Sequence, residues 1–257
     1  MAQFQSEPIL FDVPSGKIKC SVLGKRLPSS RLSVVVPGAA YSSKQPLLYY
    51  LTQALLSQGD QVLTIDSLYA DDENWLSLPT EEARYRYVLD DAESLFPQIQ
   101  ALSQSGIHTV VARSLGAYSL ACALRKDLIH PEKIVWQCPS LHDKWSILKN
   151  SKSSSIVIIG KADSRYDHAA PFLPAGSFVA ENADHTMEVG DPIQSIDILK
   201  RVTEYTVLWL EDTCVDVSQL ERNIRLTPEQ RLTEHQAALD LCEKLAQAGQ
   251  RFNEQSQ

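Results

Sequence analysis

Short apolar runs alternate with helix-length segments along most of the chain, and this alternation constrains the fold more than any other feature. Strand-like runs occupy residues 32–38, 61–66, 108–114, 133–139, 154–163 and 177–185, after an opening pair of runs at 9–24. Helix-length segments lie between them at 44–59, 81–106 and 115–127, and another follows at 191–212. The pattern predicts an α/β protein in which an antiparallel hairpin precedes a mostly parallel central sheet with helices on both faces.

Two of the helical segments have apolar positions at helical spacing. In the first, Leu47, Leu51 and Leu55 recur every four residues, which predicts a face that covers the sheet. In the last, the apolar positions are Ile193, Ile196, Ile198, Leu199 and Val202. We expect this helix also to pack on the sheet.

The pattern changes after about residue 212. Thr227, Pro228 and Gln230 form a capping-box sequence, and Gly249 stands where a helix would end, so a helix is predicted over about 228–248. Its apolar stripe is too narrow to form a core alone. We therefore divide the chain into a domain at 1–212 and a C-terminal linker and capped helix at 213–257. The helix is expected to dock on its own domain or to form a homodimer.

A serine stands where the run at 108–114 meets the helix at 115–127. The sequence Ala112-Arg113-Ser114-Leu115-Gly116 matches a G-x-S-x-G turn, with alanine in place of the first glycine. Small residues on each side allow a strand and a helix to approach closely, and the serine hydroxyl then points out of the sheet edge. Ser114 is therefore a candidate nucleophile.

A serine nucleophile needs a base and an acid that orients the base. Asp163 ends the run at 154–163, and His185 ends the run at 177–185. Because the carboxyl ends of parallel strands meet at one edge of a sheet, we expect Ser114, Asp163 and His185 to form a catalytic triad. Asp167 is the alternative acid.

The same chemistry requires two backbone N–H groups to stabilise a negatively charged oxygen. The amide of Leu115 follows the nucleophile, and the loop after the run at 32–38 offers the amide of Ala39 or Ala40. These residues are the predicted oxyanion hole.

Three further residues are candidates for contact with substrate. Arg113 adjoins the candidate nucleophile and has a planar guanidinium that would bind a carboxylate or phosphate. The favoured alternative is that its stem packs at the edge of the sheet and its guanidinium points into water. Tyr41 and Tyr69 follow strands on the predicted active-site edge, where they would line a pocket or lie partly in the core.

The segments "VVVPGAAYSSKQPLLYYLTQALL", "ARSLGAYS", "IGKADSRYD" and "ADHTMEVGD" resemble those of small, lidless bacterial α/β-hydrolases, over residues 1–212. The resemblance implies the α/β-hydrolase fold and a triad of Ser114, Asp163 and His185. Only about 14 residues separate "CPS" at 138–140 from the next strand, too few for a helical lid.

Charge and composition exclude several classes of function. The net charge of −8 gives no basic field for nucleic acid. No apolar run is long enough to span a membrane, and the N-terminus lacks the features of a signal peptide, so we expect a cytoplasmic protein. No metal-ligand spacing and no dinucleotide or nucleotide loop occurs, so neither a metal nor a cofactor is predicted.

The sequence therefore predicts a serine hydrolase that cleaves an ester, thioester or related acyl bond in a small molecule. The alternative is a catalytically degenerate protein that keeps the fold for binding or as a scaffold, because fold does not fix function. Ala112 in the turn and the appended helix favour this alternative.

Overall fold

A computed structural model of the chain describes residues 6–24, 31–103 and 106–211, together with Thr227, Gln230 and Gln236. The chain divides into two compact units, Met1–Glu211 and Asp212–Gln257. The first unit contains β1 Ser6–Val13, β2 Gly16–Leu23, β3 Leu32–Val36, α1 Pro46–Ser57, β4 Gln61–Ile65, α2 Glu73–Leu76, α3 Glu81–Ala101, β5 Ile107–Arg113, α4 Leu115–Arg125, β6 Pro131–Gln137, α5 Ile147–Asn150, β7 Ser154–Gly160, α6 Tyr166–Ala169, β8 Phe178–Ala180 and α7 Pro192–Leu210. Short 3₁₀ turns lie at Tyr69–Asp71 and Ala170–Phe172.

The strands form one eight-stranded sheet in the order β1-β2-β4-β3-β5-β6-β7-β8. β1 and β2 form the predicted antiparallel hairpin, and β2 pairs with β4 in antiparallel orientation. All the remaining pairs are parallel. The carboxyl ends of β3, β5, β6, β7 and β8 therefore point the same way, which confirms the prediction of a mostly parallel sheet.

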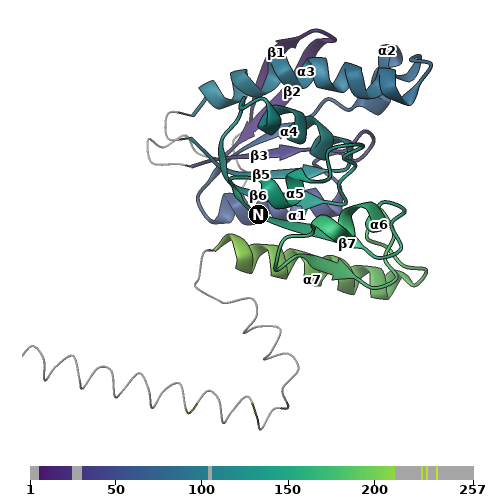
Figure 1. Cartoon of the computed structure of the whole chain (residues 1–257). Coiled ribbons are helices and arrows are strands. Elements are labelled where there is room, and N and C mark those ends of the chain that lie inside the picture. The colour runs from purple at the N-terminus through teal and green to yellow at the C-terminus, as the bar shows by residue number, and fades with distance from the viewer. Residues whose placement is uncertain are drawn as a thin grey trace, which may run out of the picture. The chain divides into compact units, whose positions relative to one another are not determined.

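Helices cover both faces of the sheet (Figure 1). One apolar core joins α3 and α4 to the sheet residues Val34, Val110 and Ile134. The other joins α1 and α7 to the alternate residues Val35, Val111 and Val135. Successive residues of a strand face opposite ways, so the near-continuous apolar runs are those of strands buried on both sides.

The buried side of α1 agrees with the sequence, and that of α7 differs from it. Leu47, Leu51 and Leu55 are all buried, as the four-residue spacing predicts. In α7, Ile198 and Val202 are buried together with Thr206 and Leu210. The expectation that Ile193 and Ile196 pack on the sheet is wrong, because their exposed fractions are 66% and 60%.

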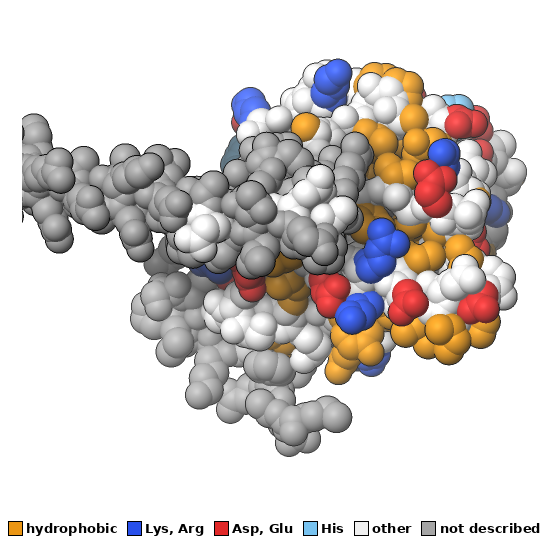
Figure 2. Space-filling model, turned by 90° about the horizontal axis from the view of Figure 1, so that it is seen from below, with side chains coloured by type: hydrophobic (Ala, Val, Ile, Leu, Met, Phe, Trp, Pro, Cys, Tyr) orange, Lys and Arg blue, Asp and Glu red, His pale blue; other side chains and the backbone are white. Residues whose placement is uncertain are grey.

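Helix geometry accounts for this difference. The buried residues of α7 recur every four positions, whereas Ile193 and Ile196 lie five and two residues before Ile198, on the far side of a helix with 3.6 residues per turn. Figure 2 views the molecule from below, the side on which α7 lies in Figure 1, and shows hydrophobic side chains exposed among charged ones.

Two strands end three or more residues earlier than the sequence predicts. β7 ends at Gly160 and β8 at Ala180, so Asp163 and His185 lie in the loops that follow these strands. Among the helices of the described residues, none is both long and apolar enough to cross a membrane.

The predicted capping box forms at the start of the helix predicted at 228–248. Thr227 Oγ1 accepts a hydrogen bond from the Gln230 amide at 3.3 Å, and Gln230 Oε1 accepts one from the Thr227 amide at 2.8 Å. The rest of the helix predicted at 228–248 lies outside the described residues, apart from Gln236.

Candidate active site

The nucleophile candidate lies on a strained turn between β5 and α4. Ser114 has φ 50° and ψ −118°, a conformation that side chains rarely adopt. Its amide donates to the Gln137 carbonyl oxygen at 3.0 Å, and its own carbonyl oxygen accepts from the amides of Ala117 and Ser140. These hydrogen bonds to β6, to the loop after it and to α4 hold the turn in place, and Ser114 itself is partly exposed.

Two small residues allow this turn to form. A methyl group on Gly116 would collide with the Pro37 carbonyl oxygen, so glycine is required where α4 crosses the end of β3. Ala112, which stands where the motif has its first glycine, is fully buried and pairs with Val36 and Trp136 in the sheet. Alanine at this position is therefore compatible with the strained turn.

Ser114, His185 and Asp163 form a continuous hydrogen-bonded chain. The Nε2 atom of His185 lies 2.9 Å from Ser114 Oγ, and its Nδ1 atom lies 2.7 Å from Asp163 Oδ2. The other carboxylate oxygen of Asp163 accepts from the Arg165 amide at 3.0 Å. With Nδ1 bound to the carboxylate, the imidazole is oriented so that Nε2 faces the serine.

Asp163 is suited to orient a base. Burial by itself would raise the pKa of the Asp163 carboxyl, but its hydrogen bonds from His185 and from the Arg165 amide, with the nearby charges of both side chains, outweigh burial and lower the pKa. The carboxylate therefore stays ionised at neutral pH. Asp167, the alternative acid, is exposed, and no hydrogen bond links it to His185 among the described residues.

The loop that carries His185 packs tightly against the end of β7. A methyl group on Gly160 would collide with the Ala183 carbonyl oxygen, which itself accepts from the Ala162 amide at 2.9 Å. Asp184 braces the next residues, because its Oδ1 accepts from the amides of Thr186 and Glu188 at 2.7 and 3.1 Å.

The predicted oxyanion amides belong to the expected segments. Leu115 is the first residue of α4, where N–H groups have no partner within the helix. Ala39 and Ala40 follow β3 and are partly buried and exposed, respectively. The loop is fixed on either side of their amides, because Gly38 donates to the Tyr41 carbonyl oxygen at 3.1 Å and Ala70 donates to that of Ala39 at 2.9 Å.

Arg113 is buried at the carboxyl end of β5. Its exposed fraction is 1%, its Nη2 atom donates to the His185 carbonyl oxygen at 2.8 Å, and its guanidinium lies over the Tyr41 ring. The expectation that this side chain points into water is wrong, because segments distant in the sequence cover it.

Tyr69 lines a cavity of about 440 Å³ between the end of the sheet, α3 and α4. Its hydroxyl contacts the buried carboxylate of Asp91 at 3.3 Å. The cavity borders Gly38 and Gly116, although Ser114, Asp163 and His185 do not line it. A methyl group on Gly38 would lie 3.2 Å from Ser114 Cβ, so the loop that lines the cavity also passes close to Ser114.

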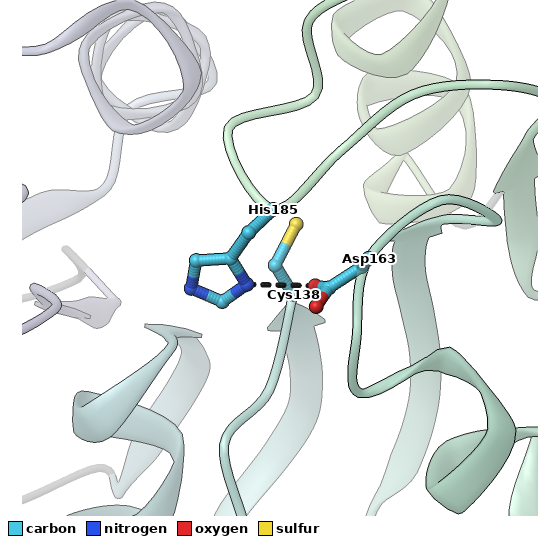
Figure 3. A group of neighbouring side chains, drawn as sticks. All are labelled: Cys138, Asp163 and His185. Carbon is cyan, nitrogen blue, oxygen red and sulfur yellow. Dashed lines mark hydrogen bonds and ion pairs between the residues drawn. The ribbon is translucent and has the colours of Figure 1, made fainter.

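Two residues that sequence reasoning missed lie next to the hydrogen-bonded chain. Ser140 is buried, and its Oγ lies 3.4 Å from Ser114 Oγ. The Cys138 side chain lies beside Asp163 and His185 (Figure 3). Both residues follow β6, which lies between β5 and β7, the strands that precede Ser114 and Asp163. Their position after a strand at the same edge of the sheet could have identified them from the sequence.

Cys138, Asp163 and His185 are also the one group among the described residues whose donor atoms lie close enough to share a metal ion, all within 4.8 Å. The imidazole nitrogens are already bound to Asp163 and Ser114. Burial raises the pKa of the Cys138 thiol, although the neighbouring Arg113 guanidinium opposes this effect. A neutral thiol next to a fixed cation is a poor metal ligand, so we interpret the group as part of the hydrogen-bonded site.

Comparison with known proteins identifies the architecture. No protein-family model and no curated protein matches the sequence. Among solved structures, a dienelactone hydrolase from Anabaena variabilis superposes with a TM-score of 0.57 at 16% identity, covering 79% of this chain and 97% of that one. An α/β serine hydrolase homologue from Coxiella burnetii gives 0.56 at 14%, covering 77% and 96%. A lidless α/β serine hydrolase from Xanthomonas campestris gives 0.53 at 17%, covering 81% and 97%.

The chain has the α/β-hydrolase fold. At these identities the likeness concerns architecture, and the chemistry has to be argued from the site. Within this α/β-hydrolase fold, the segment between β6 and β7 contains one helix, the four-residue α5. That segment carries no helical lid, which agrees with the short spacing in the sequence.

Proposed function

We propose that the protein is a serine hydrolase that cleaves a carboxylic ester, thioester or related acyl bond. The observation that carries the proposal is the hydrogen-bonded chain from Ser114 through His185 to Asp163, which begins at a strained, partly exposed turn. A serine at the helix start would by itself be an ordinary cap, but Ser114 makes no capping bond and faces an imidazole instead.

In the proposed reaction, Ser114 Oγ attacks the substrate carbonyl carbon while His185 Nε2 accepts the hydroxyl proton. The negative charge on the carbonyl oxygen is stabilised by the amides of Leu115 and of Ala39 or Ala40. His185 returns the proton to the leaving group, and an acyl-enzyme forms. Water then attacks the acyl-enzyme with His185 again as base. The acyl bond to Ser114 breaks, His185 returns the proton to Ser114 Oγ, and the carboxylic acid leaves, while Asp163 stabilises the imidazolium in each step.

We further propose that the substrate is a small molecule. The site lacks a helical lid between β6 and β7, and the cavity beside the oxyanion loop, at about 440 Å³, has the size of a small-ligand site. Tyr69 at its wall is the proposed substrate contact. A cytoplasmic location and independence of any cofactor stay predictions of the sequence.

A fluorophosphonate probe tests the proposal, because it reacts with activated serines. We expect it to label the folded wild-type protein, and labelling to disappear in Ser114→Ala and to fall by about 10³-fold or more in His185→Ala. Mass spectrometry of the labelled peptide identifies the site. Absence of labelling in folded wild-type protein would support the non-catalytic scaffold instead.

A further inference from the structure

Arg113 is a buried cation that the proposed chemistry does not use. It is the last residue of β5, directly before Ser114, and it is among the largest fully buried side chains of the described residues. Burying a guanidinium is costly unless its charge is compensated by hydrogen bonds or a partner. The contacts that compensate it therefore indicate what the residue does.

Those contacts reach two different parts of the site. Arg113 Nη2 donates to the His185 carbonyl oxygen at 2.8 Å, and the guanidinium carbon lies 3.9 Å from the centre of the Tyr41 ring. The Nε and Nη1 atoms have no hydrogen-bond partner among the described residues. The compensation thus comes mainly from a carbonyl dipole and an aromatic face.

Tyr41 in turn fixes the oxyanion loop. Its hydroxyl accepts from the Leu47 amide in the first turn of α1 at 3.0 Å, and its carbonyl oxygen accepts from the Gly38 amide at 3.1 Å. The ring beneath Arg113 is therefore held at one end by a helix and at the other by the loop that contains Ala39 and Ala40.

We propose that Arg113 is a positioning residue that holds the His185 segment and the oxyanion loop in register with Ser114. This inference rests on the proposed function. One side chain, adjacent to the nucleophile in the sequence, touches the backbone of the base and the ring that anchors the loop. Displacement of either segment by about 1 Å would cost roughly 10²-fold in rate without removing any reacting group.

The test compares Arg113→Met, which keeps bulk but removes the charge and the donors, with Arg113→Lys, which keeps the charge. Hydrolysis of p-nitrophenyl acetate is measured at neutral pH. For Arg113→Met we expect kcat to fall about 10- to 100-fold and KM to stay within about twofold, because the reacting groups are displaced and the substrate contacts are kept. For Arg113→Lys we expect a lower kcat and an unchanged KM.

Arg86→Met is the matched control, because Arg86 is exposed and pairs with Asp90 on the surface of α3. It should leave both kcat and KM unchanged. If Arg113→Met does not fold, the kcat of Arg113→Lys decides, since lysine keeps the charge and much of the bulk.

Unchanged kcat in a folded Arg113 variant, or a loss that appears only as lower thermal stability, would overturn the inference while wild-type labelling of Ser114 keeps the proposed function. Wild-type protein that neither reacts with the probe nor hydrolyses the ester would overturn both.

Discussion

At the scale of single residues, Ser114 is the proposed nucleophile and also a site of backbone strain. A non-glycine residue at φ 50° and ψ −118° lowers the stability of the folded state by on the order of 1–3 kcal/mol. The surrounding hydrogen bonds must offset this strain. Glycine adopts positive φ without that cost. The geometry that exposes the hydroxyl is therefore less stable than the same turn without a side chain.

This strain predicts that two inactive variants differ in stability. Ser114→Gly should raise the free energy of unfolding by about 1 kcal/mol relative to Ser114→Ala, because only glycine relieves the strain. Neither variant should hydrolyse ester. Chemical denaturation of both proteins measures the difference, and equal midpoints would contradict a strained turn.

A second experiment distinguishes Asp163 from Asp167 as the acid of the proposed triad. Asp163→Asn should lower kcat by about 10³-fold or more, because the amide no longer selects the tautomer in which Nε2 accepts the serine proton. Asp167→Asn is the control, since Asp167 is exposed. Kinetics with p-nitrophenyl acetate compares them, and a larger loss in Asp167→Asn would reassign the acid.

The sequence predicted the positions of the three proposed triad residues better than the positions of the side chains around them. Ser114, Asp163 and His185 follow strands in a parallel sheet, so topology alone brings them to one edge. The direction of the Arg113 side chain depends on Tyr41 and on His185, which lies 72 residues away in the chain. No local pattern encodes such a contact.

At the scale of elements, the His185 loop depends on its contact with β7. Gly160→Ala should push the loop away, because the added methyl group meets the Ala183 backbone rather than a flexible side chain. We expect a loss of about 1–3 kcal/mol in stability and a marked fall in labelling of Ser114. Gly190→Ala is the matched control, since nothing lies within 4 Å of its added methyl group.

The periodicity of apolar residues predicts the helices and strands, but it does not fully predict which side of a helix is buried, because that depends on the neighbouring elements. Alternating apolar runs predicted every long strand and helix of the first unit. The burial of α7 was predicted only in part, because an apolar residue at helical spacing identifies a helix but not which of its sides meets the sheet. Ile193 and Ile196 are the residues that this ambiguity misassigned.

At the scale of the whole molecule, a buried polar cluster connects the strands at the sheet edge opposite the site. Asp60, before β4, accepts from Arg31 Nε at 2.9 Å and Ser33 Oγ at 2.6 Å, and contacts His108 Nδ1 at 3.2 Å. Burial alone would raise the pKa of Asp60, but its hydrogen bonds with His108 and Ser33 and the Arg31 charge outweigh burial and lower it.

The lowered pKa makes part of the stability sensitive to acid. In the unfolded chain the Asp60 carboxyl has a pKa of about 3.9, and in the folded protein its pKa is lower. The ionised carboxylate therefore contributes fully to stability above about pH 4, and this contribution is lost as pH falls through the folded-state pKa. Asp60→Asn should lower stability at pH 7 by about 2 kcal/mol and flatten the decline below pH 4. Denaturation from pH 2 to 7 measures both, with exposed Asp71→Asn as control.

Removal of the tail tests the division of the chain. Deletion after Asp212 should preserve labelling of Ser114, because every residue of the proposed site belongs to the first unit. If the predicted helix forms a homodimer, the truncated protein should have a smaller mass by light scattering or lower solubility. Loss of labelling in a folded, monodisperse truncated protein would assign the tail a part in the site.

The bond between Ser114 and His185 spans 71 residues of sequence. At roughly 5–20 residues per second, a ribosome takes about 4 to 14 s to synthesise the intervening segment. During that interval the growing chain already contains its serine and the oxyanion loop, yet it has no base to activate the hydroxyl. If the proposed function is correct, a newly made molecule becomes reactive only after all eight strands of the sheet have been translated.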